Sequence, residues 1–172
     1  MMTKFVLDSD CLIKLTKSQI LKKLVENFNC IISEKVYDEC VVEGKKRFYE
    51  DASQIDDLVI SKKLGVRKAG RNVNVRKMIG EINTLGSGEI STLFLFFNTK
   101  ADAVISDDQA FLDVLYKNSI SFIVPVDVII RLTELRVITV KEALEGLERL
   151  APYIREKDYL RAKKLLEVKK YG

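Results

Sequence analysis

Acidic side chains follow two short apolar segments of this chain. Asp8 comes directly after KFVL, and Asp107 and Asp108 come directly after AVIS. Both apolar segments have the length and composition of buried strands, and the carboxyl ends of parallel strands meet at one edge of a sheet. We therefore expect these acids to lie close together at that edge.

Two further acids are predicted to lie on helices. Glu39 belongs to the segment VYDEC, at the margin of its buried face, and the neighbouring Asp38 is the competing choice. Glu89 falls in the first turn of an apolar helix that begins at GSGE, and the flanking Gly86 and Gly88 permit close approach of another group. Both helix-borne acids can therefore converge on the edge where the strand-end acids lie.

Each acid also has a structural role available to it. Asp8 or Asp108 would cap the helix that follows, and Glu89 would stabilise its own helix by roughly 0.3–1 kcal/mol through the helix dipole. However, several carboxylates within a few ångströms raise one another's pKa values unless a divalent cation compensates them. We therefore predict an Mg²⁺ or Mn²⁺ site held by Asp8, Glu89, Asp107 and Asp108, with Glu39 as a further catalytic acid. Such a site activates water against a phosphate ester.

The composition excludes several other catalytic designs. The 172 residues contain no histidine, which excludes a Ser-His-Asp triad, a Cys–His pair and His-ligated zinc. The three cysteines are an odd number, and none has CxxC spacing, so neither a disulfide framework nor a zinc knuckle is expected. The net charge of +4 indicates a polyanionic partner.

The order of the predicted elements is that of an α/β protein. Strands are predicted at 4–8, 29–32, 102–108 and 121–124, with helices between them. The alternation predicts a central parallel sheet flanked by helices. Thr139 opens a capping box, T-x-x-E, and Pro152 separates that helix from a Lys-rich helix at about 156–169. We therefore expect a domain over 1–137 that carries the acids and a two-helix extension over 138–172.

A basic segment interrupts the pattern between residues 61 and 77. It holds seven cations among glycines and asparagines, which predicts an irregular loop inserted into the domain. Such a loop would bind a phosphate backbone with salt-dependent affinity, through Arg67, Lys68, Arg71, Arg76 and Lys77. Arg71, Asn72 and Asn74 would also read an unpaired base. The alternative is a solvated loop without a partner.

No segment of the sequence predicts contact with a membrane. No apolar run approaches the ~20 residues that a membrane helix requires. The N-terminal stretch MMTKFVLDSD reaches charged residues too early for a secretory signal. We expect a cytoplasmic protein.

Four segments, taken in order, resemble the PIN-domain nucleases. FVLDSDCLIKL resembles the family's opening strand and its first acid, here Asp8, and VYDEC resembles the segment with the second, here Glu39. GSGEISTLFL resembles the helix start that carries the third acid, here Glu89. VISDDQAF resembles the strand end with the fourth, here Asp107, beside a neighbouring Asp108. The four segments in this order are fairly specific.

The resemblance covers about residues 4–135 and implies a Rossmann-like PIN fold with Mg²⁺- or Mn²⁺-dependent cleavage of RNA. It also points to toxins of the VapC type, so a homodimer and a small antitoxin protein are implied as partners. The chain departs from the family at Asp10, where a small hydroxyl or amide residue is usual, and in the basic segment and the helical tail. We expect accessory roles for Ser9 and Asp10.

Two other functions remain open from the sequence. FVLDSD also resembles the D-x-D opening of haloacid-dehalogenase-type phosphatases, in which Asp8 would be phosphorylated and Asp10 would be the general acid. That scheme leaves Glu39 and Glu89 without a role, and no G-D-G-x-N-D-like segment is found. The second is a non-catalytic module that binds RNA or a protein, since acids in the right order do not prove turnover.

Overall fold

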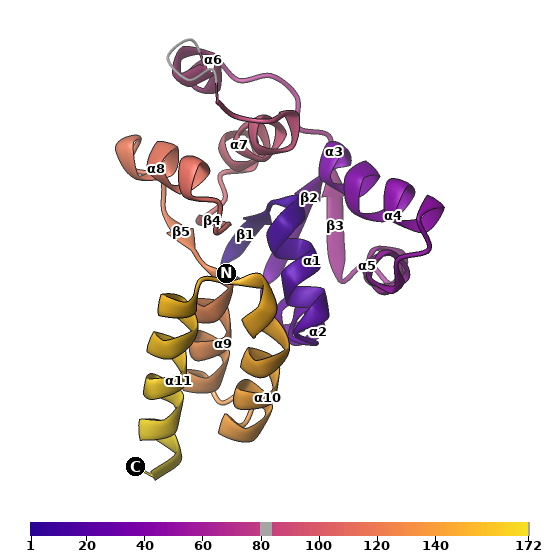
Figure 1. The fold of residues 1–172 in the computed structure, drawn as a ribbon. Helices are drawn as coiled ribbons and strands as arrows, with labels where there is room; N and C mark the ends of the chain where they lie inside the picture. The colour runs from indigo at the N-terminus through magenta and orange to yellow at the C-terminus, as the bar shows by residue number, and fades with distance from the viewer. Residues whose placement is uncertain (80–83, 172) are drawn as a thin grey trace.

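The centre of the protein is a parallel sheet of five strands (Figure 1), seen in a computed structural model that describes residues 1–79 and 84–171. The strands lie in the order β3 (Leu64–Arg67), β2 (Asn29–Ser33), β1 (Lys4–Leu7), β4 (Ala103–Ile105) and β5 (Phe122–Ile123). All four neighbouring pairs are parallel. The predicted α/β class with a parallel sheet flanked by helices is therefore confirmed.

Alternate residues of the central strands pack into apolar clusters on opposite faces of the sheet. On β1, Phe5 and Leu7 belong to the largest cluster, whereas Val6 faces the other side. The first face is covered by α1 (Ser9–Lys17), α2 (Leu21–Asn27), α5 (Glu50–Ile60) and α9 (Pro125–Glu134). The second is covered by α7 (Ser87–Thr99) and α8 (Gln109–Lys117). Burial on both faces explains why these strands are apolar throughout.

The chain after β2 is one helical stretch with a widened turn in its middle. It comprises α3 (Glu34–Tyr37), the π-helical η1 (Asp38–Val42) and α4 (Glu43–Lys46). Ser33 caps its start by accepting a hydrogen bond from the Val36 N–H at 3.1 Å. Single π-turns inside helices are frequent at functional sites, and this one carries Glu39.

The predicted loop at 61–77 is wrong, because this segment contains β3 and α6 (Val73–Ile79). Leu64 pairs along β2 and is buried in the largest cluster, and Val75 is buried in the cluster that α7 and α8 share. Asn98 of α7 holds the segment between β3 and α6 through two hydrogen bonds. Its side-chain nitrogen donates to the Ala69 carbonyl at 2.5 Å, and its side-chain oxygen accepts from Asn72 at 2.9 Å. The basic segment is thus the sheet edge and a docked helix.

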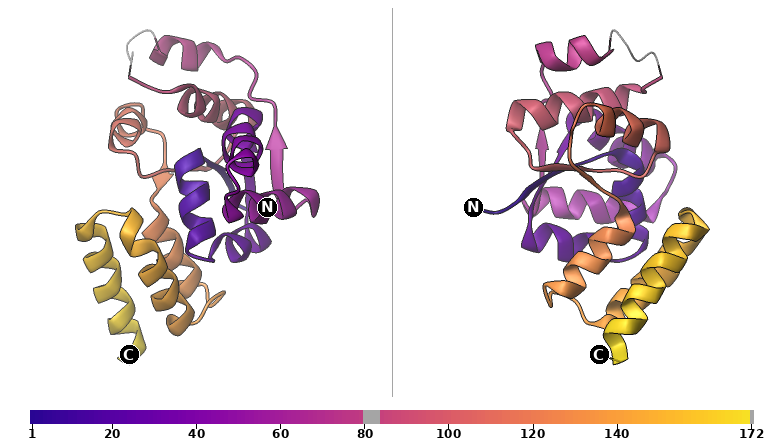
Figure 2. Two further views of the ribbon diagram at one scale, coloured as in Figure 1. Left: turned by 45° about the vertical axis from the view of Figure 1, so that its right-hand side comes forward. Right: turned by 90° about the vertical axis from the view of Figure 1, so that its left-hand side faces the viewer.

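The predicted two-helix extension is present as α10 (Val140–Leu150) and α11 (Glu156–Tyr171), joined by η2 (Ala151–Tyr153). The expected capping box forms, since the Glu142 carboxylate accepts from the Thr139 N–H at 2.7 Å and the Thr139 hydroxyl accepts in return. Both helices pack on α9 and on each other, at the end of the molecule opposite α6 (Figure 2). The division at residue 137 stays a prediction.

Within the described part of the chain, no helix is both long enough and apolar enough to cross a membrane.

The three cysteines are free and buried, as expected from their spacing. They lie in the largest apolar cluster and pack as small hydrophobic side chains.

Candidate functional site

The predicted acids gather where the sheet changes its direction of growth. Strands β2 and β3 lie on one side of β1, and β4 and β5 lie on the other. In parallel sheets the crevice at such a switch point, beyond the carboxyl ends of the strands, is the usual ligand site. Asp8 leaves β1 here beside the end of β4, and its N–H donates to the Ile105 carbonyl at 3.3 Å.

Asp8 lies at the bottom of this crevice and is only 4% exposed. One oxygen accepts from the Cys11 N–H at 2.8 Å, which caps α1, and the other accepts from the Ser106 hydroxyl. Burial raises the pKa of Asp8 to about 6, although both hydrogen bonds act to lower it. The capping role that the sequence allowed is therefore real, and it fixes the orientation of the carboxylate.

An open hollow of about 510 Å³ lies above Asp8, and we call it the carboxylate cleft. Four of the predicted acids line it, together with both accessory residues and the first turn of α7. Its lining comprises Asp8, Ser9, Asp10, Glu39, Thr84, Gly86, Ser87, Gly88, Glu89 and Asp108. The structure therefore brings acids from four separate segments to one surface hollow.

Glu39 enters the cleft across the start of α7. The Ser9 hydroxyl donates to its Oε2 at 2.5 Å. A Cβ atom at Gly88 would lie 2.9 Å from the same oxygen, so only glycine lets the carboxylate approach this turn. The helix N-terminus carries partial positive charge that favours an anion there. Asp38, the competing choice, is exposed and does not line the cleft.

Glu89 lies one residue beyond this contact, in the first turn of α7. Its Oε2 accepts from the Gly86 N–H at 2.8 Å, so it stabilises its helix as predicted. Burial raises the pKa of Glu89, and the negative charges of Asp108 and Glu39 act in the same direction. These three carboxylates therefore interact electrostatically across the cleft.

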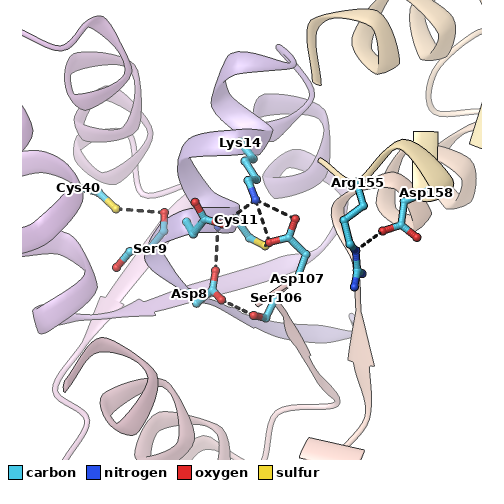
Figure 3. Close-up of polar contacts among 10 residues, drawn as sticks. Asp8, Ser9, Cys11, Lys14, Cys40, Ser106, Asp107, Arg155 and Asp158 are labelled. Carbon is cyan, nitrogen blue, oxygen red and sulfur yellow. Dashed lines mark hydrogen bonds and ion pairs between the residues drawn. The ribbon is translucent and has the colours of Figure 1, made fainter. Parts of the chain in front are cut away.

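The two acids after β4 have separate surroundings. Asp108 caps α8 by accepting from the Phe111 N–H at 2.9 Å, and it lines the cleft. Asp107 does not line the cleft but points to α1 (Figure 3). There it accepts from Lys14 Nζ at 2.9 and 3.1 Å and from the Cys11 thiol at 3.5 Å. Of the two acids predicted as ligands after β4, Asp108 therefore lines the cleft and Asp107 does not.

Lys14 is a site residue that the sequence prediction missed. Its ammonium lies 2.7 Å from Asp10 as well as contacting Asp107. Burial alone would lower the pKa of Lys14, but the hydrogen bonds from these two carboxylates outweigh it and raise the pKa to about 12. Its i,i+4 spacing from Asp10 was the only available signal, and such pairs are common on solvated helix faces.

The five cations predicted to bind RNA are all exposed and lie outside the cleft; they are Arg67, Lys68, Arg71, Arg76 and Lys77. Arg76 and Lys77 lie on α6, and the other three lie on β3 or between β3 and α6. Helix α6 packs on α7, whose N-terminal turn forms part of the cleft. Both polar groups of the Asn72 side chain form hydrogen bonds within the protein. Its oxygen accepts from the Asn74 N–H at 2.9 Å, and its nitrogen donates to Asn98. A base-reading role for Asn72 would require these bonds to break.

The cleft has donors that suit a hard cation, although they are not assembled around one point. Among residues 1–79 and 84–171, no group of three or more His, Cys, Asp or Glu side chains is close enough to hold a metal ion. Glu39, Glu89 and Asp108 are partly or fully exposed and can rotate toward Asp8. The donors are carboxylate oxygens, which suit Mg²⁺ or Mn²⁺. The Cys40 thiol offers no soft alternative, because burial raises its pKa to about 12.

The phosphatase alternative fits this geometry poorly. That scheme gives no role to Glu39 and Glu89, although both line the cleft with Asp8. Asp10, the general acid of that scheme, forms an ion pair with Lys14 at 2.7 Å.

Comparison with known proteins extends the resemblance seen in the motifs. A family model described as a PIN domain matches residues 4–168, so the match includes α10 and most of α11. Comparison with curated proteins returns no match. The family match covers nearly the whole chain, in agreement with the parallel sheet and the acids at its switch point. The chain therefore belongs to the PIN-domain family.

Proposed function

We propose that this protein is an Mg²⁺- or Mn²⁺-dependent ribonuclease that hydrolyses phosphodiester bonds of RNA. The observation that carries the proposal is the convergence of Asp8, Glu39, Glu89 and Asp108 on one open cleft. These acids come from four separate segments. If each were only a solvated surface residue, they would have no reason to gather in one cleft. Membership of the PIN-domain family supports a nuclease-like activity.

Asp8, Glu89 and Asp108 are the residues that would hold the cation. When bound, a divalent cation lowers the pKa of a water molecule and offsets the charge that develops on the phosphate. Asp8 is fixed by Cys11 and Ser106 and provides a rigid base for the site. Glu89 keeps one oxygen on the Gly86 N–H, which leaves its other oxygen for the cation.

The substrate class is argued from charge. The cleft is acidic and open, so a polyanion needs cations outside it for affinity. The five exposed cations on β3, on α6 and between them would provide this charge, and α6 packs against α7. An open cleft also suits a flexible single strand, whose sugar–phosphate backbone can bend into it.

Cleavage of a labelled single-stranded RNA tests the proposal. We expect cleavage with Mn²⁺ or Mg²⁺ and none with chelator, and a loss of about 100-fold or more in Glu39→Gln. Asp38→Asn is the matched control, because Asp38 is the adjacent acid but is exposed and outside the cleft. It should cleave within about twofold of the wild type. Intact RNA with either metal, or equal rates for the two variants, would contradict the proposal.

A second candidate function is a non-catalytic RNA-binding module. The observation that favours it is that the acids, in the described part of the chain, do not form a ready-made metal site. Each of the four also accepts a hydrogen bond from the protein itself. RNA binding that is equally tight with and without chelator, with no cleavage, would favour this function.

We further propose that the activity is that of a toxin with a protein antitoxin, and that the chain forms a homodimer. The apolar side chains exposed on α11 support self-association; they are Leu160, Leu165 and Val168. Induced expression should arrest growth for the wild type and not for Asp8→Asn. Light scattering should report the mass of two chains, and a mass of one chain would refute the dimer.

A further inference from the structure

Lys14 occupies an unusual place beside the carboxylate cleft. Its ammonium lies between Asp10, at 2.7 Å, and the two oxygens of Asp107, at 2.9 and 3.1 Å. The side chains of Lys14 and Asp107 are only 15% and 10% exposed. An ammonium has three N–H donors, and these three contacts use all of them. Lys14 is therefore a fixed charge and not a solvated surface lysine (Figure 3).

The ammonium compensates acids that would otherwise repel one another. Asp10 and Asp107 both contact the same Nζ atom, and the charge of Asp10 also acts to raise the pKa of Asp8. The Asp10 side chain is 61% exposed, whereas that of Asp107 is 10% exposed, so the buried Asp107 carboxylate is the one that most requires a positive charge beside it. A second divalent cation would provide that charge in a two-metal nuclease, where the ions lie roughly 3.5–4 Å apart.

We propose that Lys14 is a built-in substitute for a second metal ion, so that the cleft binds one divalent cation. This inference rests on the proposed function, because it presumes the cation held by Asp8, Glu89 and Asp108. Lys14 acts as a positioning residue: its ammonium holds Asp107 outside the lining of the cleft and pairs with Asp10, which lines it. The placement of Asp107 outside the lining of the cleft follows from the same contact.

The inference predicts how the number of bound ions depends on the charge at residue 14. Lys14→Gln has a similar length and retains N–H donors, but it leaves Asp10 and Asp107 without a positive charge. Carboxylate oxygens so placed are ligands for Mg²⁺ or Mn²⁺, so this variant should gain a second ion. Lys14→Arg keeps the charge and should bind one ion, as the wild type does.

The test is titration of the full-length, chelator-treated protein with Mn²⁺ alone, followed by calorimetry and by the electron paramagnetic resonance of free Mn²⁺. We expect one ion per chain in the wild type and two in Lys14→Gln, with the second site at least about tenfold tighter than any second site in the wild type. The double variant Lys14→Gln/Asp107→Asn should return to one ion. Lys17→Gln is the matched control, since Lys17 lies on the same helix but pairs with Asp51 at 2.7 Å.

The outcomes separate this inference from the function on which it rests. Two ions in the wild type, or one ion in Lys14→Gln, would overturn the role of Lys14 and leave the proposed nuclease intact. No ion in the wild type would contradict the metal site itself, and the inference with it. If Lys14→Gln unfolds without metal, its thermal stability as a function of Mn²⁺ replaces the count of ions. Stabilisation that depends on two bound ions would then support the inference, and dependence on one would refute it.

Discussion

Replacing Asp8 with asparagine should stabilise the metal-free protein while abolishing cleavage. Asp8 is almost fully buried, and the asparagine is nearly the same shape. Its carbonyl oxygen can accept the Cys11 N–H, and its amide can donate to the Ser106 hydroxyl, which can also accept. The substitution therefore keeps both hydrogen bonds and removes only the buried charge.

The magnitude follows from the pKa of Asp8. Burial raises that pKa from 3.8 to about 6, so the folded protein disfavours the ionised form. One pKa unit corresponds to about 1.4 kcal/mol, which gives about 3 kcal/mol for this group as an upper value. A group whose pKa is raised by folding contributes stability that is fully present below its unfolded pKa and is lost as the pH rises through its folded pKa. The advantage of Asp8→Asn should therefore grow between about pH 4 and pH 6 and then level off.

The assay is urea unfolding of the wild type and Asp8→Asn in chelator, at several pH values from 4.5 to 8. We expect the free energies of unfolding to separate by up to about 3 kcal/mol above pH 6 and to converge at the acid end. Adding Mn²⁺ should raise the stability of the wild type only, since the variant lacks a metal ligand. Equal or lower stability of Asp8→Asn at pH 8 would refute the argument that a buried charge destabilises this site.

Three other substitutions test separate contacts. Gly88→Ala places a Cβ atom 2.9 Å from the Glu39 carboxylate, so cleavage of RNA should fall at least about tenfold while the melting temperature drops by only a few degrees. Ser106→Ala removes a donor to buried Asp8, which should lower the free energy of unfolding by about 1–3 kcal/mol at pH 8 in urea titration. Thr139→Ala loses the cap of α10 and should lower it by about 1 kcal/mol without changing the cleavage rate.

The strand-end acids could be predicted because their position depends on one simple rule. Asp8 follows an apolar strand, and parallel strands deliver such residues to one edge. Glu39 was predicted from its place at the margin of a buried helix face, and Glu89 was predicted from the glycines beside it; both line the cleft. The close approach of the Glu39 carboxylate to Gly88 was not predicted. The motif order then identified the family over most of the chain.

The errors have a common physical cause. In the basic segment only Leu64 and Val75 are fully buried, so tertiary pairing with β2 and packing on α7 decide its structure, and local pattern does not. The sequence left open whether Asp107 or Asp108 reaches the cleft, because that depends on Lys14, which binds Asp107 and leaves Asp108 at the cleft. The spacing of residue types along the chain does not predict contacts between residues that are far apart in sequence.

A structural role and a catalytic role are compatible for Glu89 and Asp108, because each uses only one of its two oxygens for its helix. Asp8 and Asp108 cap helices, and Glu89 holds the N–H at the start of its own helix, each through one oxygen. A cap fixes the carboxylate in one orientation before any ligand arrives, which reduces the entropy lost on binding. For Glu89 and Asp108 the second oxygen is thereby directed to a defined place. Helix caps can therefore orient carboxylates that a cation would still have to draw together, and a capping role is no argument against a catalytic one.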